Sequence, residues 1–112
     1  MENAIEIRHY VSRGGKDVFD EWLTDLADAR AQAKIASRIN RLAVGNFGDC
    51  KSLRHGLYEL RIDLGPGYRV YYAMLGRACV LLLCGGDKGR QSRDIERALE
   101  YLKDYRERTI TT

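Results

Sequence analysis

The segment LYELRIDLGPGYRVYY, residues 57–72, alternates apolar and polar side chains on both sides of a Gly-Pro-Gly turn. A period of two is typical of β-strands, and the turn residues indicate an antiparallel hairpin. We expect a three-residue loop, 65–67, that pairs Leu64 with Tyr68, because this register puts both apolar sets on one face. The opposite face is then predicted to be an exposed patch made of Glu59, Arg61, Asp63, Arg69 and Tyr71.

The rest of the chain predicts helices and strands around this hairpin. The stretch 46–56 is expected to be a loop, and residues 75–78 a two-residue hairpin turn into a last strand. That strand is apolar on both faces, so it should be central, with the first strand beside it, and the glycines after it should end the sheet. Ser92 is the expected N-cap of the terminal helix. The elements in chain order are a strand at 4–10, two helices that form a hairpin at 16–29 and 29–46, the two hairpin strands, a strand at 78–84 and a helix at 92–108.

Length and composition place narrow bounds on the class of protein. The chain has 112 residues, so we expect a single domain, 1–112, and the 45% hydrophobic and 31% charged residues are typical of globular proteins. No apolar run is long enough to span a membrane, and the first residues do not form a signal peptide, which predicts a cytoplasmic protein. The three cysteines, at 50, 79 and 84, suit a reducing compartment and core positions. Neither a metal site nor a cofactor motif is predicted.

Net charge is only +3, but the basic residues are unevenly distributed. The segment 29–45 carries four cations and no acid, at spacings of four, four and three that return to one side of a helix. A stripe of this kind is either a solvated face or a surface for phosphates. The cations of the helix and of the loop after it are Arg30, Lys34, Arg38, Arg41, Lys51, Arg54 and His55.

A second group of polar residues suggests chemistry at one end of the sheet. Arg61 and Arg69 share a strand face, and Lys88 and Gln91 follow the last strand. Arginine presents a planar fork of donors that matches phosphate oxygens, so the group suits a phosphodiester. The alternative is a solvated face on which Glu59 makes cross-strand ion pairs of small energy.

Several separated motifs resemble one family over residues 3–105. The chain is similar to the RelE/ParE superfamily of bacterial toxins, and within it to the HigB-like addiction-module killer branch. The resemblance implies an α+β, RelE-like fold: a strand, a helical hairpin, a three-stranded antiparallel meander and a C-terminal helix. The motifs are GNFGD (45–49), GLYELRID (56–63), GPGYRVYY (65–72), GGDK (85–88) and DIERA (94–98).

The resemblance also implies a function. RelE-like toxins cut mRNA in the ribosome without a metal, through attack of the ribose 2′-OH on the neighbouring phosphate, and a small antitoxin from the adjoining gene, commonly with a helix-turn-helix domain, neutralises them. By similarity Arg69 and Arg61 stabilise the phosphate, Glu59 or Lys88 moves protons and Gln91 orients. The basic helix and loop residues would bind the ribosome.

Two alternatives stay open at this point. The superfamily includes ParE-like members that poison DNA gyrase, and a non-catalytic member would serve its antitoxin only as a partner in autoregulation. The position of the catalytic tyrosine of RelE is near Ile95 here, and that of its loop arginine is at Gly89 or Arg90. The fold alone does not choose between these activities.

Overall fold

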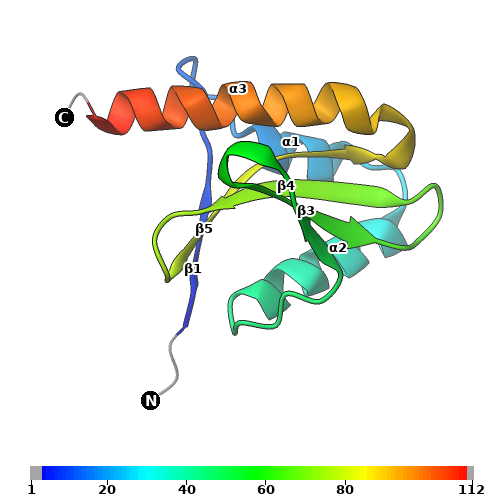
Figure 1. The fold of residues 1–112 in the computed structure, drawn as a ribbon. Coiled ribbons are helices and arrows are strands. Elements are labelled where there is room, and N and C mark those ends of the chain that lie inside the picture. The colour runs from blue at the N-terminus through cyan, green and yellow to red at the C-terminus, as the bar shows by residue number, and fades with distance from the viewer. Residues whose placement is uncertain (1–3, 111–112) are drawn as a thin grey trace.

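One sheet of five strands organises the structure, a computed structural model that describes residues 4–110 (Figure 1). The strand order is β1-β5-β4-β3-β2, with β1 parallel to β5 and every other pair antiparallel. This arrangement confirms the α+β class, the three-stranded meander and the terminal helix. The elements are β1 (Glu6–His9), α1 (Val18–Asp25), α2 (Ala29–Leu42), β2 (Cys50–Ser52), the 3₁₀ turn η1 (Arg54–Gly56), β3 (Leu57–Ile62), β4 (Tyr68–Met74), β5 (Cys79–Asp87), the 3₁₀ turn η2 (Lys88–Arg90) and α3 (Gln91–Ile110).

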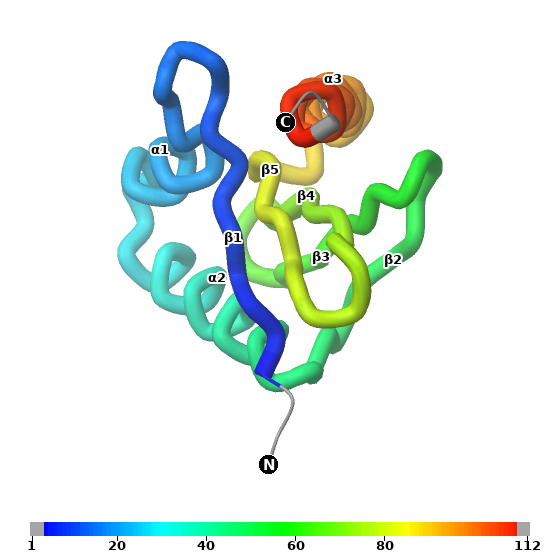
Figure 2. The backbone as a smooth tube through the Cα atoms, turned by 90° about the vertical axis from the view of Figure 1, so that its left-hand side faces the viewer, coloured from blue at the N-terminus to red at the C-terminus, as the bar shows by residue number. Residues whose placement is uncertain are grey.

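Helices cover the sheet on both faces. Figure 2 shows α1 and α2 on one side of the strands and α3 on the other. Alternate side chains of β5 therefore enter different cores: Val80 and Leu82 pack with α1 and α2, whereas Leu81 and Leu83 pack with α3. This explains why the strand is apolar on both faces, and it confirms the prediction of a central strand next to β1. No helix within residues 4–110 is both long and apolar enough to cross a membrane.

The β3–β4 loop is longer than predicted. Ile62 pairs with Tyr68, so the loop spans five residues, 63–67, and the predicted pairing of Leu64 with Tyr68 is wrong. Leu64 instead accepts a hydrogen bond from Gly67 N at 3.0 Å, in a turn where Gly65 and Gly67 have positive φ angles. The register differs from the prediction by two residues, which leaves every side chain on its predicted face.

Several predicted boundaries also need correction. The loop 46–56 contains the short strand β2, and the turn before β5 has three residues, 76–78, because Leu75 N donates to Cys79 O. The helices α1 and α2 are shorter than predicted, and Asp17 and Asp28 cap them. Ser92 lies inside α3, which begins at Gln91, so it is not the N-cap.

The strand β5 continues through the two glycines that were expected to end the sheet. A Cβ atom at Gly85 would overlap the indole ring of Trp22, and one at Gly86 would overlap the carboxylate of Asp94. These positions are glycine because helices on both faces approach the backbone here. The glycine pair therefore marks a point where both helical layers contact the backbone of the sheet.

We predict that Gly85→Ala destabilises the fold by about 1–3 kcal/mol, because the methyl group forces the ring of Trp22 out of its packing. Urea unfolding measures the change. Gly14→Ala is the matched control: its Cβ would meet only Ser12 Oγ, at 4.0 Å, so its stability should stay within about 0.5 kcal/mol of wild type. Equal unfolding midpoints for the two variants would contradict this role of the glycine.

Candidate functional site

A buried carboxylate lies at the centre of the predicted cluster. Glu59 has 0% exposure on β3, and Arg61 Nε donates to its Oε1 at 3.1 Å. Gln91 Nε2, from the first turn of α3, donates to Oε2 at 2.5 Å, and Arg69 Nε lies 3.7 Å from the same oxygen. Arg61 and Arg69 stand directly opposite each other on β3 and β4. Two like charges in that position repel, so the carboxylate between them is what allows the pair.

The cluster is less accessible than predicted. The side chain of Arg61 is 35% exposed and that of Arg69 only 12%, and Arg69 Nη1 donates to the carbonyl oxygen of Tyr68 at 3.2 Å. The expected exposed patch is wrong for Glu59 and Tyr71, which are fully buried, and right for Asp63. The reason is that α3 packs over this face of β4 and β5.

Two further buried polar groups lie in the same layer. Burial, and then the negative charges of Glu59 and Asp94, raise the pKa of Tyr71, so its hydroxyl stays protonated. Burial also raises the pKa of Asp94, opposed by Arg97, whose Nη1 lies 4.0 Å from Asp94 Oδ1. The sequence pattern had indicated no role for Asp94 and only a place on the patch for Tyr71. The predicted register put Arg61 opposite Tyr71, so the pairing of Tyr71 with Glu59 became visible only in the observed register.

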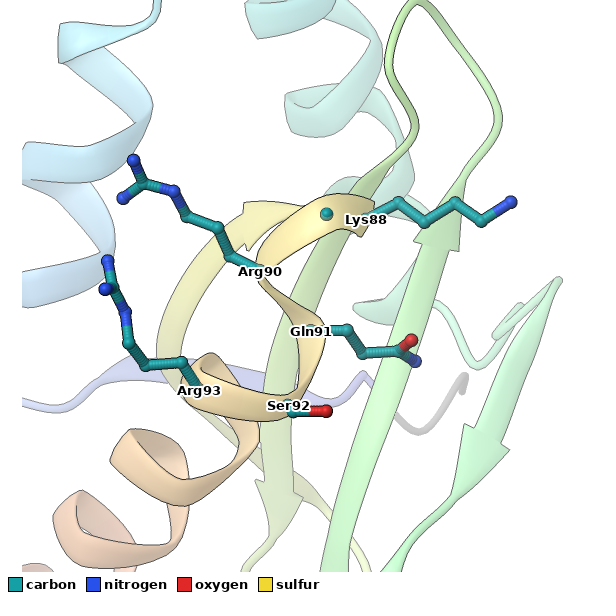
Figure 3. A pocket seen from close by; sticks show the side chains of 6 residues that line it. Lys88, Arg90, Gln91, Ser92 and Arg93 are labelled. Carbon is teal, nitrogen blue, oxygen red and sulfur yellow. The ribbon is translucent and has the colours of Figure 1, made fainter.

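The turn η2 places one cation, Lys88, on the side of β3 and β4 (Figure 3). It is joined to the β3–β4 loop by a hydrogen bond of 2.7 Å from Lys88 N to Gly67 O. In Figure 3, Lys88 and Gln91 point to the side of β3 and β4, whereas Arg90 and Arg93 point the opposite way. These residues, with Gly89 and Ser92, line a cavity of about 440 Å³. The structure thus brings Lys88 and Gln91 to the end of the sheet where Arg69 lies, as predicted.

The predicted basic stripe on α2 is only partly a surface. Arg30, Lys34 and Arg41 are exposed. Arg38 is 92% buried, since its exposure is 8%, and its guanidinium donates to three carbonyl oxygens, at 2.7 Å to Arg61, 3.4 Å to Phe47 and 3.5 Å to Asp49. The assignment of Arg38 to ribosome binding is therefore corrected: it fastens the loop after α2 to β3.

The loop cations lie apart from the stripe. Lys51, Arg54 and His55 are exposed, but Arg54 forms an ion pair with Glu96 of α3, and His55 accepts a 3.2 Å hydrogen bond through its carbonyl from Arg106 of the same helix. Because α2 and α3 cover opposite faces of the sheet, the seven predicted cations do not form one continuous surface. Residues 4–110 contain no cluster of three or more His, Cys, Asp or Glu side chains placed to hold a metal ion. Cys79 and Cys84 are core residues, as expected, while Cys50 is half-buried.

The fold and this cluster define a class. A five-stranded sheet with a terminal helix and an arginine pair on its hairpin is compatible with a RelE-like fold. The family described as "Phage derived protein Gp49-like (DUF891)" matches residues 21–103. An uncharacterized protein of Haemophilus influenzae is 56% identical over 80 residues, which are 71% of this chain and 81% of that protein. The chain belongs to the Gp49-like family, a toxin-like family of the RelE/ParE type.

We predict that Arg38→Ala lowers the free energy of unfolding by about 1–3 kcal/mol, because it leaves carbonyl oxygens near β3 without their donor. Chemical denaturation measures the decrease. Lys34→Ala, an exposed cation on the same helix, should change stability by less than about 0.5 kcal/mol. If Arg38→Ala were as harmless as Lys34→Ala, the assignment of Arg38 to the fold would be wrong.

Proposed function

We propose that this chain is the toxin of a type II toxin-antitoxin pair, of the HigB-like branch, and that it inhibits translation by cutting mRNA in the ribosome. The observation that carries the proposal is the arginine pair of the β3–β4 hairpin, held by Glu59 and Gln91 and bordered by Lys88. Membership in a toxin-like family supports the toxin assignment.

RNA cleavage by the 2′-OH needs a group that stabilises an anionic phosphorus centre. Arg61 uses Nε for Glu59, and its 35% exposed side chain has further donors in the planar fork that suits phosphate. Glu59 and the carbonyl oxygen of Tyr68 fix the guanidinium of Arg69 beside Arg61. Fixed donors of this kind stabilise a developing charge most strongly where water is excluded. We assign the phosphate to these two arginines.

The burial of Glu59 decides its role. A carboxylate with 0% exposure does not contact a ribose hydroxyl, so Glu59 is assigned to orienting Arg61 and Arg69. We assign Lys88, which is exposed on the same side (Figure 3), to protonating the leaving oxygen, while the proton of the attacking 2′-OH passes to solvent water. Gln91 holds the second oxygen of Glu59.

Ribosome binding is assigned to the exposed cations. Arg30 and Lys34 line a cavity of about 470 Å³ between α2 and the β3–β4 loop, which contributes Asp63 and Leu64. Arg41 continues the stripe, and Lys51, Arg54 and His55 provide a second basic area. Removal of one cation that binds a phosphate should reduce the salt dependence of binding by roughly one unit of slope. The proposed setting is the cytoplasm, and the proposed partner is an antitoxin encoded next to the toxin, commonly of the helix-turn-helix type.

The low exposure of Arg69, 12%, favours a second candidate. In a non-catalytic member of the family, the same cluster would only hold α3 on the sheet. The chain would then bind its antitoxin as a partner in autoregulation. Expression of the chain alone distinguishes the candidates. Growth arrest with cut mRNA supports the endonuclease, unimpaired growth supports the non-catalytic member, and DNA breaks with intact mRNA indicate a gyrase poison.

We predict that Arg69→Lys lowers mRNA cleavage by about 100-fold or more, because lysine keeps the charge but lacks the planar donor fork. Primer extension on cellular mRNA after induction measures the cuts, and thermal unfolding confirms that the variant is folded. Arg77→Ala, an exposed cation of the β4–β5 turn, should cleave like wild type. Full toxicity of a folded Arg69→Lys variant would remove Arg69 from the reaction.

A further inference from the structure

Within residues 4–110, three buried polar atoms on β4 and the first turns of α3 have no hydrogen-bond partner: Arg69 Nε, Tyr71 Oη and Asp94 Oδ2. Buried polar atoms in native proteins are nearly always paired, so each exception calls for an explanation. The three atoms belong to β4 and the first turns of α3, around the cluster proposed to bind RNA. Their number in one layer suggests that the hydrogen bonds of this layer change when substrate binds.

Tyr71 is the member of this group that can serve Glu59. It pairs with Glu59 across the β3–β4 hairpin, and the charge of Glu59 acts on its hydroxyl. The register of β4 against β5 shifts between Tyr71 and Tyr72, and such irregularities are common beside active sites, where they redirect a side chain. A protonated hydroxyl is thus available next to the carboxylate.

An RNA phosphate changes the donors around Glu59. The phosphate attracts the free donors of Arg61 and Arg69, and a guanidinium drawn toward it weakens the 3.1 Å hydrogen bond from Arg61 Nε to Glu59. A buried carboxylate is destabilised when a donor hydrogen bond weakens, and Gln91 is the other side chain that donates to Glu59 among the described residues. A replacement donor must come from inside the protein, because Glu59 has no contact with solvent.

We propose that Tyr71 is a positioning residue of the RNA site: its hydroxyl donates to Glu59 when phosphate engages Arg61 and Arg69, and so keeps the carboxylate fixed behind both arginines. This inference rests on the proposed function and deepens it. The path from Tyr71 to the substrate runs through Glu59, and Tyr71 itself does not contact RNA.

The first test compares Tyr71→Phe with Tyr72→Phe in cleavage of ribosome-bound mRNA. Both tyrosines are buried on β4, but Tyr72 packs in the core next to α1 and α2, so its substitution controls for removal of a buried hydroxyl. Tyr71→Phe should lower kcat roughly tenfold, the effect of one hydrogen bond to a charged group, with KM within about twofold. Tyr72→Phe should leave both constants close to wild type.

A double variant tests whether Tyr71 acts on the reaction through Glu59. If Tyr71 acts through Glu59, Tyr71→Phe should have no further effect on kcat in a Glu59→Gln background. Independent, multiplied decreases would overturn the proposal, as would a Tyr71→Phe enzyme with wild-type kcat. Thermal unfolding of each variant separates a lower kcat from a smaller amount of folded protein.

A second measurement does not depend on cleavage. In nuclear magnetic resonance spectra of the wild-type chain, addition of inorganic phosphate should move the Tyr71 hydroxyl proton downfield, and Glu59→Gln should reduce that movement. An unmoved proton overturns the role of Tyr71. Absence of mRNA cleavage by wild type, together with a moved proton, would instead overturn the endonuclease and retain the link between phosphate, Glu59 and Tyr71.

Discussion

The ion pairs of Glu59 are the interaction on which the other parts of the structure depend. Arg61 and Arg69 stand opposite each other across two strands, and only an anion between them makes that pairing stable. The same carboxylate accepts a hydrogen bond from Gln91, which ties the first turn of α3 to β3. One acidic side chain therefore joins the hairpin, the last helix and the proposed phosphate site.

Much of the fold could be predicted because successive side chains of a strand point to alternate faces of the sheet. The hairpin loop was wrong by two residues, yet every side chain lay on its predicted face, since the pleat repeats every two residues. The strand β2 and the length of β5 could not be predicted in this way. Two consecutive glycines are typical of a turn, and only the packing of Trp22 and Asp94 against them explains why Gly85 and Gly86 remain in the strand.

The candidate site shows a similar division. The sequence pattern alone put Glu59 on the strand face of Arg61 and Arg69. It also brought Lys88 and Gln91 to the same end of the sheet, and the resemblance added a role for each residue. Neither source indicated how deeply the group is buried. Burial depends on α3 packing over the face, which no local pattern encodes. Arg38 was misassigned because its helical spacing matches that of exposed cations, and the spacing does not show that the loop directly after the helix folds back onto its guanidinium.

The parallel pairing of β1 with β5 has a consequence for synthesis. Glu6 pairs with Cys79, so the first strand has no partner until more than seventy later residues have been made. Contacts of such long sequence separation slow folding, and a chain emerges from the ribosome amino terminus first. Gln91, which completes the shell of Glu59, follows even later. A nascent chain thus carries Glu59 and both arginines before β5 and α3 are made, and the complete cluster cannot assemble until Gln91 has been added.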